Sequence, residues 1–462
     1  MITRVSRRFR LQVLPPNRWL SRNSWMSKRT LEDVRQKGGA TNPKRRKIFP
    51  APDPPNLAYA SSSNEAPKST PFQRPTPLIT FSYTPEHELE FSDSALRYFV
   101  DPPIGAQLGY GFDRWIRRPD EKGRIDSLLK AWSKLRREKG PLGEIGAVSW
   151  RGVMTKILTA PYEVFDGWDL NVMFIDGTMY FEEHLTEQKL YARNNLEPRH
   201  ERLTYFGYAF ESYCTSEHQP GSKSNPRPPV THVDPDGHPP GWSGDVNTNI
   251  QWCNVIKTKL GNTRLIIGGE VDCVRGQRTA KLDNLVELKT SMAISSPMDE
   301  TKFEKKLLKF FFQSFLLGVP EIVVGFRNHH GTLTTVQSFQ TMQLPRLVRG
   351  KRGSWDPQTC LEWADRFIQY LRQHINDESV AASTGNPSSE RSEDGAGEES
   401  EKKAVRKPPV WRVKFVPKSG VFVNLLDEEG VADVERGDDV DRVGFLPRWY
   451  YDEVSNKSNS HS

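Results

Sequence analysis

Three carboxylates and a lysine stand close together in the second half of the sequence. Glu270 and Asp272 lie in the segment G-E-V-D-C, and Glu287 and Lys289 lie in V-E-L-K-T. If both segments are strands, residues two apart project from the same face, so the members of each pair point together. Acidic groups flanked by Leu, Ile and Val are costly to remove from water unless a cation compensates them. The pattern therefore predicts a site for a hard divalent cation with oxygen ligands.

The spacing is also typical of a nuclease superfamily. An acidic residue followed some fifteen residues later by Glu-x-Lys resembles the PD-(D/E)xK signature, in which carboxylates hold metal and the lysine orients or polarises water. Alone, the pattern fits an edge strand with a solvated Glu-x-Lys face equally well. Gln313 on a predicted helix and Arg327 at the end of the next strand favour the nuclease, because such groups position a phosphodiester. Arg327 alone fits a surface ion pair.

The segments around these residues predict a mixed fold. Apolar spacing predicts helices at 125–135, 203–213 and 303–317. Alternating or short apolar runs predict strands at 148–159, 169–183 (turning at Asp176-Gly177), 265–274, 284–291 and 322–327, and a hairpin at 410–426. Strands and helices interleave without regular β-α alternation. We therefore expect an α/β fold of the mixed α+β kind, with two mixed β-sheets and flanking helices.

Composition divides the chain. Residues 1–75 hold 16 of the 65 basic residues and 4 of the 58 acidic ones, so the net charge of +7 comes from this segment. It has few periodic apolar positions and is expected to be a disordered tail. A second low-complexity, acidic segment at about 377–409 is expected to be a loop inserted in the domain, because a strand pattern resumes after it. The domain is thus placed at 76–452, followed by a disordered C-terminus at 453–462.

The tail carries a possible localisation signal. The run Lys44-Arg45-Arg46-Lys47 predicts nuclear localisation. The arginine-rich first 31 residues also fit a mitochondrial presequence, although Pro15 and Pro16 interrupt its helix, and a solvated tail without an address is the third alternative. The four cysteines form no C-x-x-C pair, which argues against a zinc ribbon or a disulfide-stapled secreted domain. No run approaches 18 apolar residues, so we expect no membrane partner.

Three other groups have simpler explanations than catalysis. The histidines and aspartates at 232–238 lie in a loop-like segment, and we expect no metal there. Residues 180–183 are expected to form an outward-facing acidic strand end. The three phenylalanines at 310–312 are expected to line the core or a groove wall, with base stacking as the alternative.

Eight motifs, in the same order along the chain, resemble the Rai/DXO family of RNA 5′-end decapping nucleases, on its fungal nuclear branch. They are W-R-G-x-x-T-K-I-L-T-x-P-Y-E from Trp150, G-Y-A-F-E from Gly207, G-D-V-N-T-N from Gly244, G-E-V-D-C from Gly269, V-E-L-K-T-S from Val286, K-L-L-K-F-F-F-Q-S-F-L-x-G-V-P from Lys306, G-F-R-N from Gly325 and F-L-P-R-W-Y from Phe445. The resemblance covers about residues 78–375 and 410–452.

The resemblance implies roles that the spacing does not show. It implies a PD-(D/E)xK-like core with one or two Mg²⁺ or Mn²⁺ ions. The implied metal ligands are Glu211, Glu270 (directly or through water), Asp272, Glu287 and the main-chain carbonyl of Leu288. Arg151 is expected to contact an RNA phosphate, and Lys289 and Gln313 the scissile phosphate or the nucleophilic water, with Glu211 also beside the substrate. All of these positions carry the expected residue type.

The implied activity is quality control of RNA 5′ ends in the nucleus. We expect a metal-dependent hydrolase that removes unmethylated guanosine caps and NAD caps, and pyrophosphate from 5′-triphosphate RNA. The main alternative is a stabilising, non-catalytic partner of a nuclear 5′-to-3′ exoribonuclease, which is also the expected protein partner. A DNA nuclease is the third possibility, on superfamily analogy alone. Cap preference and intrinsic exonuclease activity do not follow from the sequence.

Overall fold

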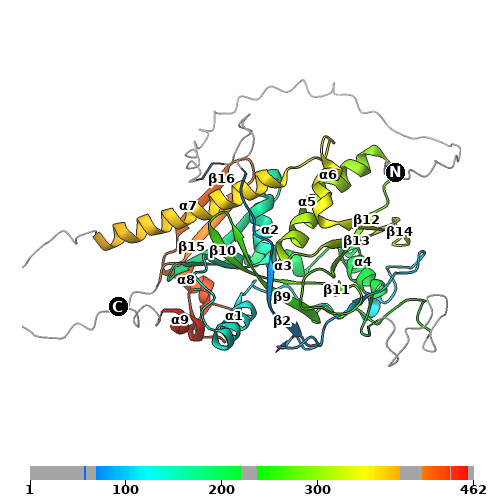
Figure 1. Cartoon of the computed structure of the whole chain (residues 1–462), viewed down its shortest axis with the longest axis horizontal. Helices are drawn as coiled ribbons and strands as arrows, with labels where there is room; N and C mark the ends of the chain where they lie inside the picture. Colours follow the sequence, from blue (N-terminus) through cyan, green and yellow to red (C-terminus); the bar gives the residue numbers. More distant parts are fainter. Residues whose placement is uncertain (1–56, 59–68, 220–236, 385–407, 438, 456–462) are drawn as a thin grey trace, which may run out of the picture. The chain divides into compact units, whose positions relative to one another are not determined.

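Two large β-sheets with helices on their faces make up the fold (Figure 1). The computed structural model describes residues 57–58, 69–219, 237–384, 408–437 and 439–455, which all belong to one unit beginning at Pro55. Within these ranges the strands form a ten-stranded sheet, a six-stranded sheet and a small two-stranded sheet. The predicted class, mixed sheets with flanking helices, is confirmed.

The ten-stranded sheet is mixed. Its spatial order is β1-β16-β15-β6-β7-β5-β10-β9-β2-β3. In chain order its strands are β1 (Leu57–Ala58), β2 (Thr76–Tyr83), β3 (Leu89–Glu90), β5 (Ala147–Trp150), β6 (Trp168–Ile175), β7 (Thr178–His184), β9 (Gln251–Leu260), β10 (Thr263–Glu270), β15 (Trp411–Val416) and β16 (Gly420–Leu425). β5 runs parallel to both β7 and β10. Asp176 and Gly177, both with positive φ, form the predicted tight turn between β6 and β7.

The six-stranded sheet carries the Glu-x-Lys strand at its centre. Its order is β14-β13-β12-β11-β4-β8. Its strands are β4 (Tyr98–Phe99), β8 (Thr215–Ser216), β11 (Cys273–Val274), β12 (Leu285–Met292), β13 (Glu321–Arg327) and β14 (Leu333–Gln340), and the separate hairpin is β17 (Arg442–Val443) with β18 (Leu446–Pro447). β12 and β13 are parallel, so a crossover helix must join them.

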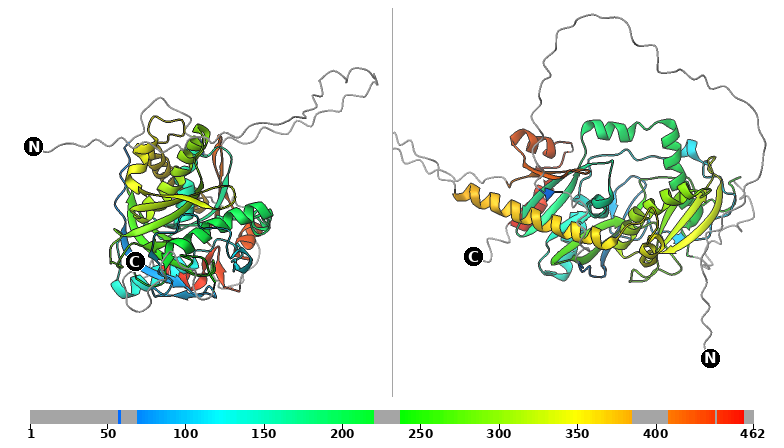
Figure 2. Two further views of the ribbon diagram at one scale, coloured as in Figure 1. Left: turned by 90° about the vertical axis from the view of Figure 1, so that its right-hand side faces the viewer. Right: turned by 90° about the horizontal axis from the view of Figure 1, so that it is seen from above.

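Helices cover both faces of the ten-stranded sheet and both faces of the six-stranded sheet. They are α1 (Asp126–Lys139), α2 (Arg151–Thr159), α3 (Glu187–Asn194), α4 (Pro198–Cys214), α5 (Pro297–Leu317), α6 (Leu344–Val348), α7 (Pro357–Thr384), α8 (Glu428–Glu435) and α9 (Arg448–Ser455), with 3-10 turns at Phe112–Arg114, Ala160–Tyr162 and Thr341–Gln343. Figure 2 shows α7 as one long helix.

Alternation along β10 shows how these layers pack. Leu265 and Ile267 join the core that contains side chains of α2, α5 and α7. Ile266, on the other face, joins the core formed with α1 and α9. α4 packs its Phe206 and Phe210 on the six-stranded sheet. The elements that carry the candidate site residues are therefore anchored by three separate apolar cores.

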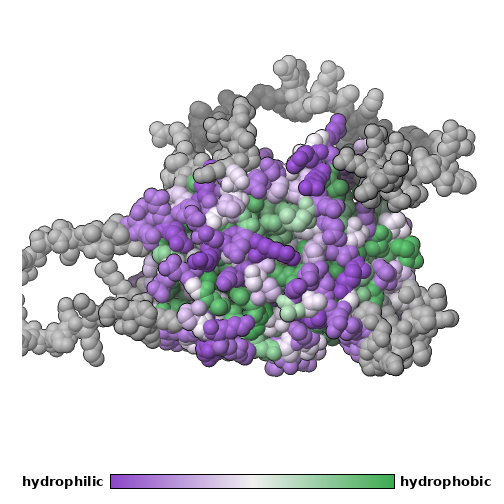
Figure 3. All heavy atoms as spheres, viewed as in Figure 1, coloured by the Kyte–Doolittle hydropathy of each residue, from purple (hydrophilic) through white to green (hydrophobic). Residues whose placement is uncertain are grey.

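The surface is mixed in character. On the face drawn in Figure 3, hydrophilic residues predominate and apolar residues gather in smaller patches between them. None of the helices in the described part of the chain is long and apolar enough to cross a membrane.

The predicted strand at 148–159 is wrong beyond Trp150. β5 ends there, and Arg151 is the first residue of α2. The buried side chains Val153, Met154, Ile157 and Leu158 follow a helical spacing that the sequence already contained. The helix therefore places Arg151 on its first turn rather than in a sheet.

The predicted single strand at 265–274 is also wrong in one respect. β10 ends at Glu270 in the ten-stranded sheet, and β11 begins at Cys273 in the six-stranded sheet. The chain passes from one sheet to the other at Val271 and Asp272. The alternation argument for Glu270 and Asp272 therefore does not apply, and the change of sheet brings them together instead.

Three predicted boundaries differ from the structure by a few residues. Thr70 and Phe72, assigned to the tail, contact Gln358 and Leu260 of the domain. α7 continues to residue 384, past the predicted start of the acidic insertion, and α9 continues to residue 455. The basic run at 44–47 and residues 385–407 of the insertion lie outside the described residues.

Candidate metal centre

Four carboxylates meet where the two large sheets adjoin. Glu270 ends β10 of one sheet, Glu287 lies within β12 of the other, and Asp272 lies where the chain crosses between them. Glu211 comes from the last turn of α4. Glu211, Glu270 and Asp272 line one pocket of about 240 Å³. The structure thus brings together the four predicted carboxylate ligands.

Glu287 is fully buried between two cations. Arg151 Nη1 lies 3.0 Å from Glu287 Oε2, and Lys289 Nζ lies 2.6 Å from Glu287 Oε1. Burial alone would raise the pKa of Glu287, but Arg151 and Lys289 outweigh it and hold the pKa below its usual value. Glu287 is therefore ionised at neutral pH, and both predicted phosphate-contacting cations lie at the cluster.

Asp272 is fixed by a main-chain hydrogen bond. The backbone N–H of Leu288 donates to Asp272 Oδ2 over 2.6 Å. Burial, followed by the charge of Glu287, raises the pKa of Asp272 to about 6. Leu288, whose carbonyl is a predicted ligand, thus lies directly beside this carboxylate.

Glu270 and Glu211 lack an ion-pair partner within the described residues. Gln251 Nε2 donates to Glu270 Oε2 over 3.2 Å. Burial, then the charge of Asp272, raises the pKa of Glu270 to about 7, and the same two causes raise the pKa of Glu211 well above its usual range. Buried carboxylates that repel one another are stabilised in their charged form only by further positive charge nearby.

The donor chemistry fits a hard divalent ion, although the side chains are not arranged around one. Among the residues that the structure describes, no three His, Cys, Asp or Glu side chains are close enough together to hold a metal ion. Arg151 and Lys289 engage the Glu287 oxygens that are predicted to be ligands. Binding a metal at Glu287 therefore requires these side chains to rearrange, while the set of carboxylate oxygens suits Mg²⁺ or a similar ion.

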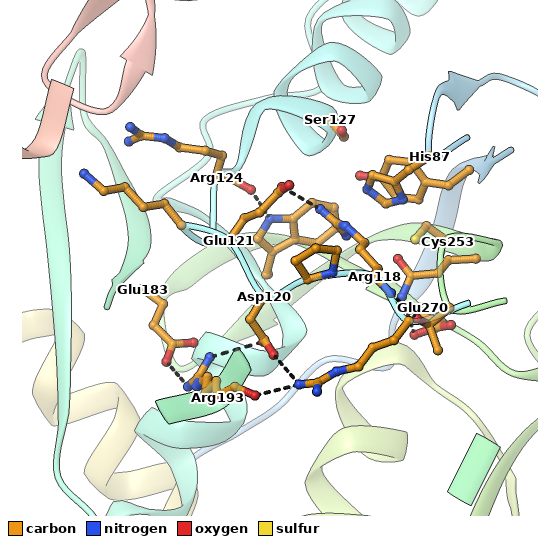
Figure 4. Close-up of a pocket in the computed structure, with 18 of the residues that line it drawn as sticks. His87, Arg118, Asp120, Glu121, Arg124, Ser127, Glu183, Arg193, Cys253 and Glu270 are labelled. Carbon is orange, nitrogen blue, oxygen red and sulfur yellow. Dashed lines mark hydrogen bonds and ion pairs between the residues drawn. The ribbon is translucent and has the colours of Figure 1, made fainter. Parts of the chain in front are cut away.

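Glu270 also lines a larger cleft (Figure 4). It has a volume of about 1130 Å³ and is bordered by the segment 115–130. Its basic and acidic side chains are similar in number, and several are paired, as Arg193 is with Glu183 at 2.9 Å. Because the cleft has little excess positive charge, a bound phosphate depends on the cations near Glu287 and on a metal.

Glu270 lies between the two pockets. Tyr208, Thr248 and Gln251 line both of them with Glu270. These three residues were not predicted as site residues. Tyr208 belongs to the G-Y-A-F-E motif and Thr248 to the G-D-V-N-T-N motif, so both had a usable signal, whereas Gln251 lies outside the motifs.

With this geometry established, comparison with known proteins decides the family. A family model described as RAI1 like PD-(D/E)XK nuclease matches residues 73–451. The chain belongs to this nuclease family. It is therefore a hydrolase of the nuclease class, and the predicted PD-(D/E)xK core and family resemblance are confirmed.

Relatives agree along most of their length. The decapping nuclease RAI1 of Mycosarcoma maydis is 36% identical over 88% of this chain and 92% of its own. The decapping and exoribonuclease protein of Mus musculus is 36% identical over 66% of this chain and 76% of its own.

Solved structures share the fold. Candida albicans Rai1 in complex with pU5-Mn2+ has a TM-score of 0.66 at 23% identity, covering 87% of this chain and 98% of its own. Scheffersomyces stipitis Rai1 in complex with (3′-NADP)+ and calcium ion has a TM-score of 0.65 at 23% identity, with the same coverage. Both of these structures are described with a divalent ion, manganese in the first and calcium in the second.

Gln313 and Arg327, the two other polar residues of the nuclease pattern, lie on either side of the family's Glu-x-Lys strand. Gln313 is half-buried on α5, and within the described residues it makes no hydrogen bond to the carboxylate cluster. Leu317, one helical turn further, packs at Gly269 beside Arg151, so this end of α5 borders the cluster. Arg327 is only 7% exposed, and the surface ion-pair explanation is wrong for it.

The remaining predictions have mixed outcomes. The expected outward-facing acidic end of β7 is wrong for Glu182, which is buried and ion-paired with Arg124 at 3.1 Å. Phe311 and Phe312 are buried in the core, and Phe310 is half-buried. In the segment 232–238, only residues 237 and 238 are described, and His238 hydrogen-bonds the Tyr110 hydroxyl at 2.8 Å.

Proposed function

We propose that this nuclease removes incomplete and non-canonical caps from RNA 5′ ends, and pyrophosphate from 5′-triphosphate RNA, with Mg²⁺ or Mn²⁺. The observation that carries the proposal is the buried carboxylate cluster, in which Glu270 lines both pockets and Glu287 is paired with Lys289 and Arg151. The names of the relatives, and the RNA and dinucleotide held by the Candida and Scheffersomyces proteins, support this class of substrate.

The metal ion and the residues of the site have different chemical roles. A bound divalent ion supplies an acidified water and neutralises charge on the phosphate. Lys289 and Arg151 place two further positive charges beside Glu287, where they offset the charge that develops on the phosphate oxygens. Gln313 is proposed to position the scissile phosphate or the water from α5.

The bond changes follow from this arrangement. The water oxygen forms a bond to the phosphorus between the first and second transcribed nucleotides. The bond from that phosphorus to the 3′ oxygen of the first nucleotide breaks, and this oxygen takes a proton. An intact cap nucleotide leaves, and the RNA retains a 5′-monophosphate. At a 5′-triphosphate end, attack on the innermost phosphorus releases pyrophosphate.

Product analysis tests the proposal. RNAs with 5′-triphosphate, unmethylated cap, methylated cap and NAD cap are incubated with Mg²⁺ or Mn²⁺, and the released nucleotides are identified by mass. We expect cap nucleotides, NAD-containing nucleotides or pyrophosphate to appear only with metal. A chain that acts only as a stabilising partner of an exoribonuclease would release none of them, and preferential cleavage of a matched DNA strand would indicate a DNA nuclease.

A further inference from the structure

His87 lies in the turn that joins β2 to β3, with its ring stacked on Tyr83. The two ring centroids are 4.0 Å apart and the ring planes differ by 13°. His87 has a φ of 64°, and its N–H donates to the Thr84 carbonyl over 2.8 Å. Its Nδ1 lies 3.1 Å from the carbonyl oxygen of Asn249, to which it donates. The turn, the stack and this hydrogen bond hold the imidazole in one orientation.

One face and one edge of this ring remain for the cleft of about 1130 Å³. Tyr83 covers one face of the imidazole, the Asn249 carbonyl occupies its Nδ1 edge, and no further aromatic ring of the described residues stacks on it. His87 nevertheless lines the cleft and is only partly buried. The imidazole therefore presents its outer face and its Nε2 edge to the cleft.

The stacked pair lies on the same face of the ten-stranded sheet as Glu270. Tyr83 pairs with Gln251 across β2 and β9, and Gln251 Nε2 donates to Glu270 Oε2 over 3.2 Å. Glu270 pairs with Cys253 across β10 and β9, and Cys253 shares a face with Gln251 because it is two residues away. Figure 4 shows His87, Cys253 and Glu270 on one side of the cleft that all of them line.

The separation between the stacked pair and Glu270 suits one nucleotide. β9 lies between β2 and β10, so two strand spacings, about 10 Å, separate the strand of Tyr83 from that of Glu270. This distance is comparable with the length of a nucleotide from its phosphate to its base. A nucleotide whose phosphate lies at the carboxylate cluster can therefore reach the imidazole with its base.

Both rings of the pair are uncharged at neutral pH. Burial lowers the pKa of His87, and burial raises the pKa of Tyr83 to about 12. Another flat ring can cover the imidazole without removing a charge from water. Stacking tolerates any base, because every base has a flat π face. Since the cleft has little excess positive charge, stacking is also the interaction that it can offer to a nucleic acid.

We propose that the outer face of His87, backed by Tyr83, stacks a base of the RNA substrate next to the scissile phosphate. The inference rests on the proposed function, because it assigns a further contact of the same substrate. The base can come from the first transcribed nucleotide, which leaves with the cap, or from the second, which stays on the RNA. Both offer the same flat ring, and substrates that lack one base at a time distinguish them.

Removing the ring and removing the base should have the same effect, and the two effects should not add. KM and kcat are measured with Mn²⁺ for capped ten-nucleotide RNAs that are complete or carry a stable abasic residue as the first or the second nucleotide. His87→Asn removes the ring but suits the positive φ. We expect it to raise KM for the complete RNA about tenfold, the order of one stacking contact, with kcat within about twofold.

The abasic RNA that lacks the stacked base should already show a KM about tenfold higher with the wild type. His87→Asn should change that KM less than twofold, because the contact is already lost. The position of the abasic residue that shows this coupling identifies the nucleotide. His87→Phe keeps a flat ring and should hold KM for the complete RNA within about threefold of the wild type.

The matched control is His374→Asn. His374 also stacks on a tyrosine, Tyr370, with ring planes 17° apart, but it lies on α7 and lines neither of the two pockets. It should leave every KM unchanged, and thermal melting checks that each variant is folded. An unchanged KM in His87→Asn, or an equal rise with all three RNAs, would overturn the inference. Kd measured with Ca²⁺ in place of Mn²⁺ reports the same contact without turnover, so an inactive wild type would refute the proposed function alone.

Discussion

Arg151 and Glu287 form an ion pair that is almost completely removed from solvent, with Nη1 and Oε2 3.0 Å apart. Arg151 is the first residue of α2, which packs on the ten-stranded sheet. Glu287 lies in β12 of the six-stranded sheet. The pair therefore links the two sheets at the carboxylate cluster. It also places a cation where an RNA phosphate is expected.

Breaking this pair should destabilise the fold. Arg151→Met leaves the Glu287 carboxylate buried with Lys289 as its one remaining cationic partner among the described residues. We expect a loss of about 3–5 kcal/mol in the free energy of unfolding, measured by urea denaturation. Arg275→Met, which breaks the half-exposed pair with Glu321, should cost about 1 kcal/mol or less. Equal losses in the two variants would show that the Arg151 pair has no special structural role.

Metal affinity should rise with pH. The pKa of Glu270 is raised to about 7 and that of Asp272 to about 6, in both cases first by burial. Their protons must leave before the oxygens can bind a cation, so affinity increases as pH rises through about 6 to 7 and then levels off. Calorimetric titration with Mn²⁺ between about pH 5 and pH 8 measures this. A constant affinity with no proton release would contradict the assignment of these ligands.

The same shifts make the metal-free protein less stable as pH rises. The native state holds protons on Glu270 and Asp272 that the unfolded chain has already lost, because the folded pKa lies above the unfolded one. In the window from about pH 4 to pH 7 the stability therefore falls with increasing pH. Chemical denaturation in EDTA tests the sign, and added Mn²⁺ should offset this fall in stability, because it binds the deprotonated carboxylates of the native state.

The sequence predicts most residues of the carboxylate cluster, but strand alternation is not what brings Glu270 and Asp272 together. Glu287 and Lys289 lie on one strand as alternation predicts. Glu270 and Asp272 come together because the chain changes sheets at Val271, and a local pattern does not contain that information. Strand pairing between segments far apart in the sequence decides which sheet each one joins.

Local sequence patterns could not predict other parts of the site either. Glu211 lies on a helix some sixty residues earlier than Glu270, so motif resemblance rather than spacing identified it. The cleft segment 115–130 approaches Glu270 through tertiary contacts alone. By contrast, the spacing of the apolar residues after Arg151 is enough to predict the helix that begins there.

Removing divalent metal should abolish turnover. Buried carboxylates without a cation have no means of activating water, so excess EDTA should stop product release from 5′-triphosphate RNA, and Mg²⁺ or Mn²⁺ should restore it. The measurement is pyrophosphate release after dialysis. Full turnover in excess chelator would exclude the metal mechanism.

The N-terminal segment should direct nuclear localisation and should not take part in catalysis. It holds the basic run at 44–47 and none of the site residues, while residues 69–75 pack on the domain and must be kept. Deleting residues 1–56 should leave kcat on short RNAs within about twofold, below about 0.5 kcal/mol, and should displace a fluorescent fusion from the nucleus. A large loss of turnover would show that the segment binds substrate.

Glu211→Gln tests the central claim most directly, because the claim is that Glu211 holds the metal from a helix outside both sheets. The amide keeps the size of the side chain but removes its charge, so at limiting Mg²⁺ we expect turnover to fall at least about 100-fold, roughly 2.7 kcal/mol, with weaker metal binding and an unchanged melting profile. Glu197→Gln, at the exposed start of the same helix, is the control and should behave as wild type. Near wild-type release of cap nucleotides by a folded Glu211→Gln variant would contradict the account.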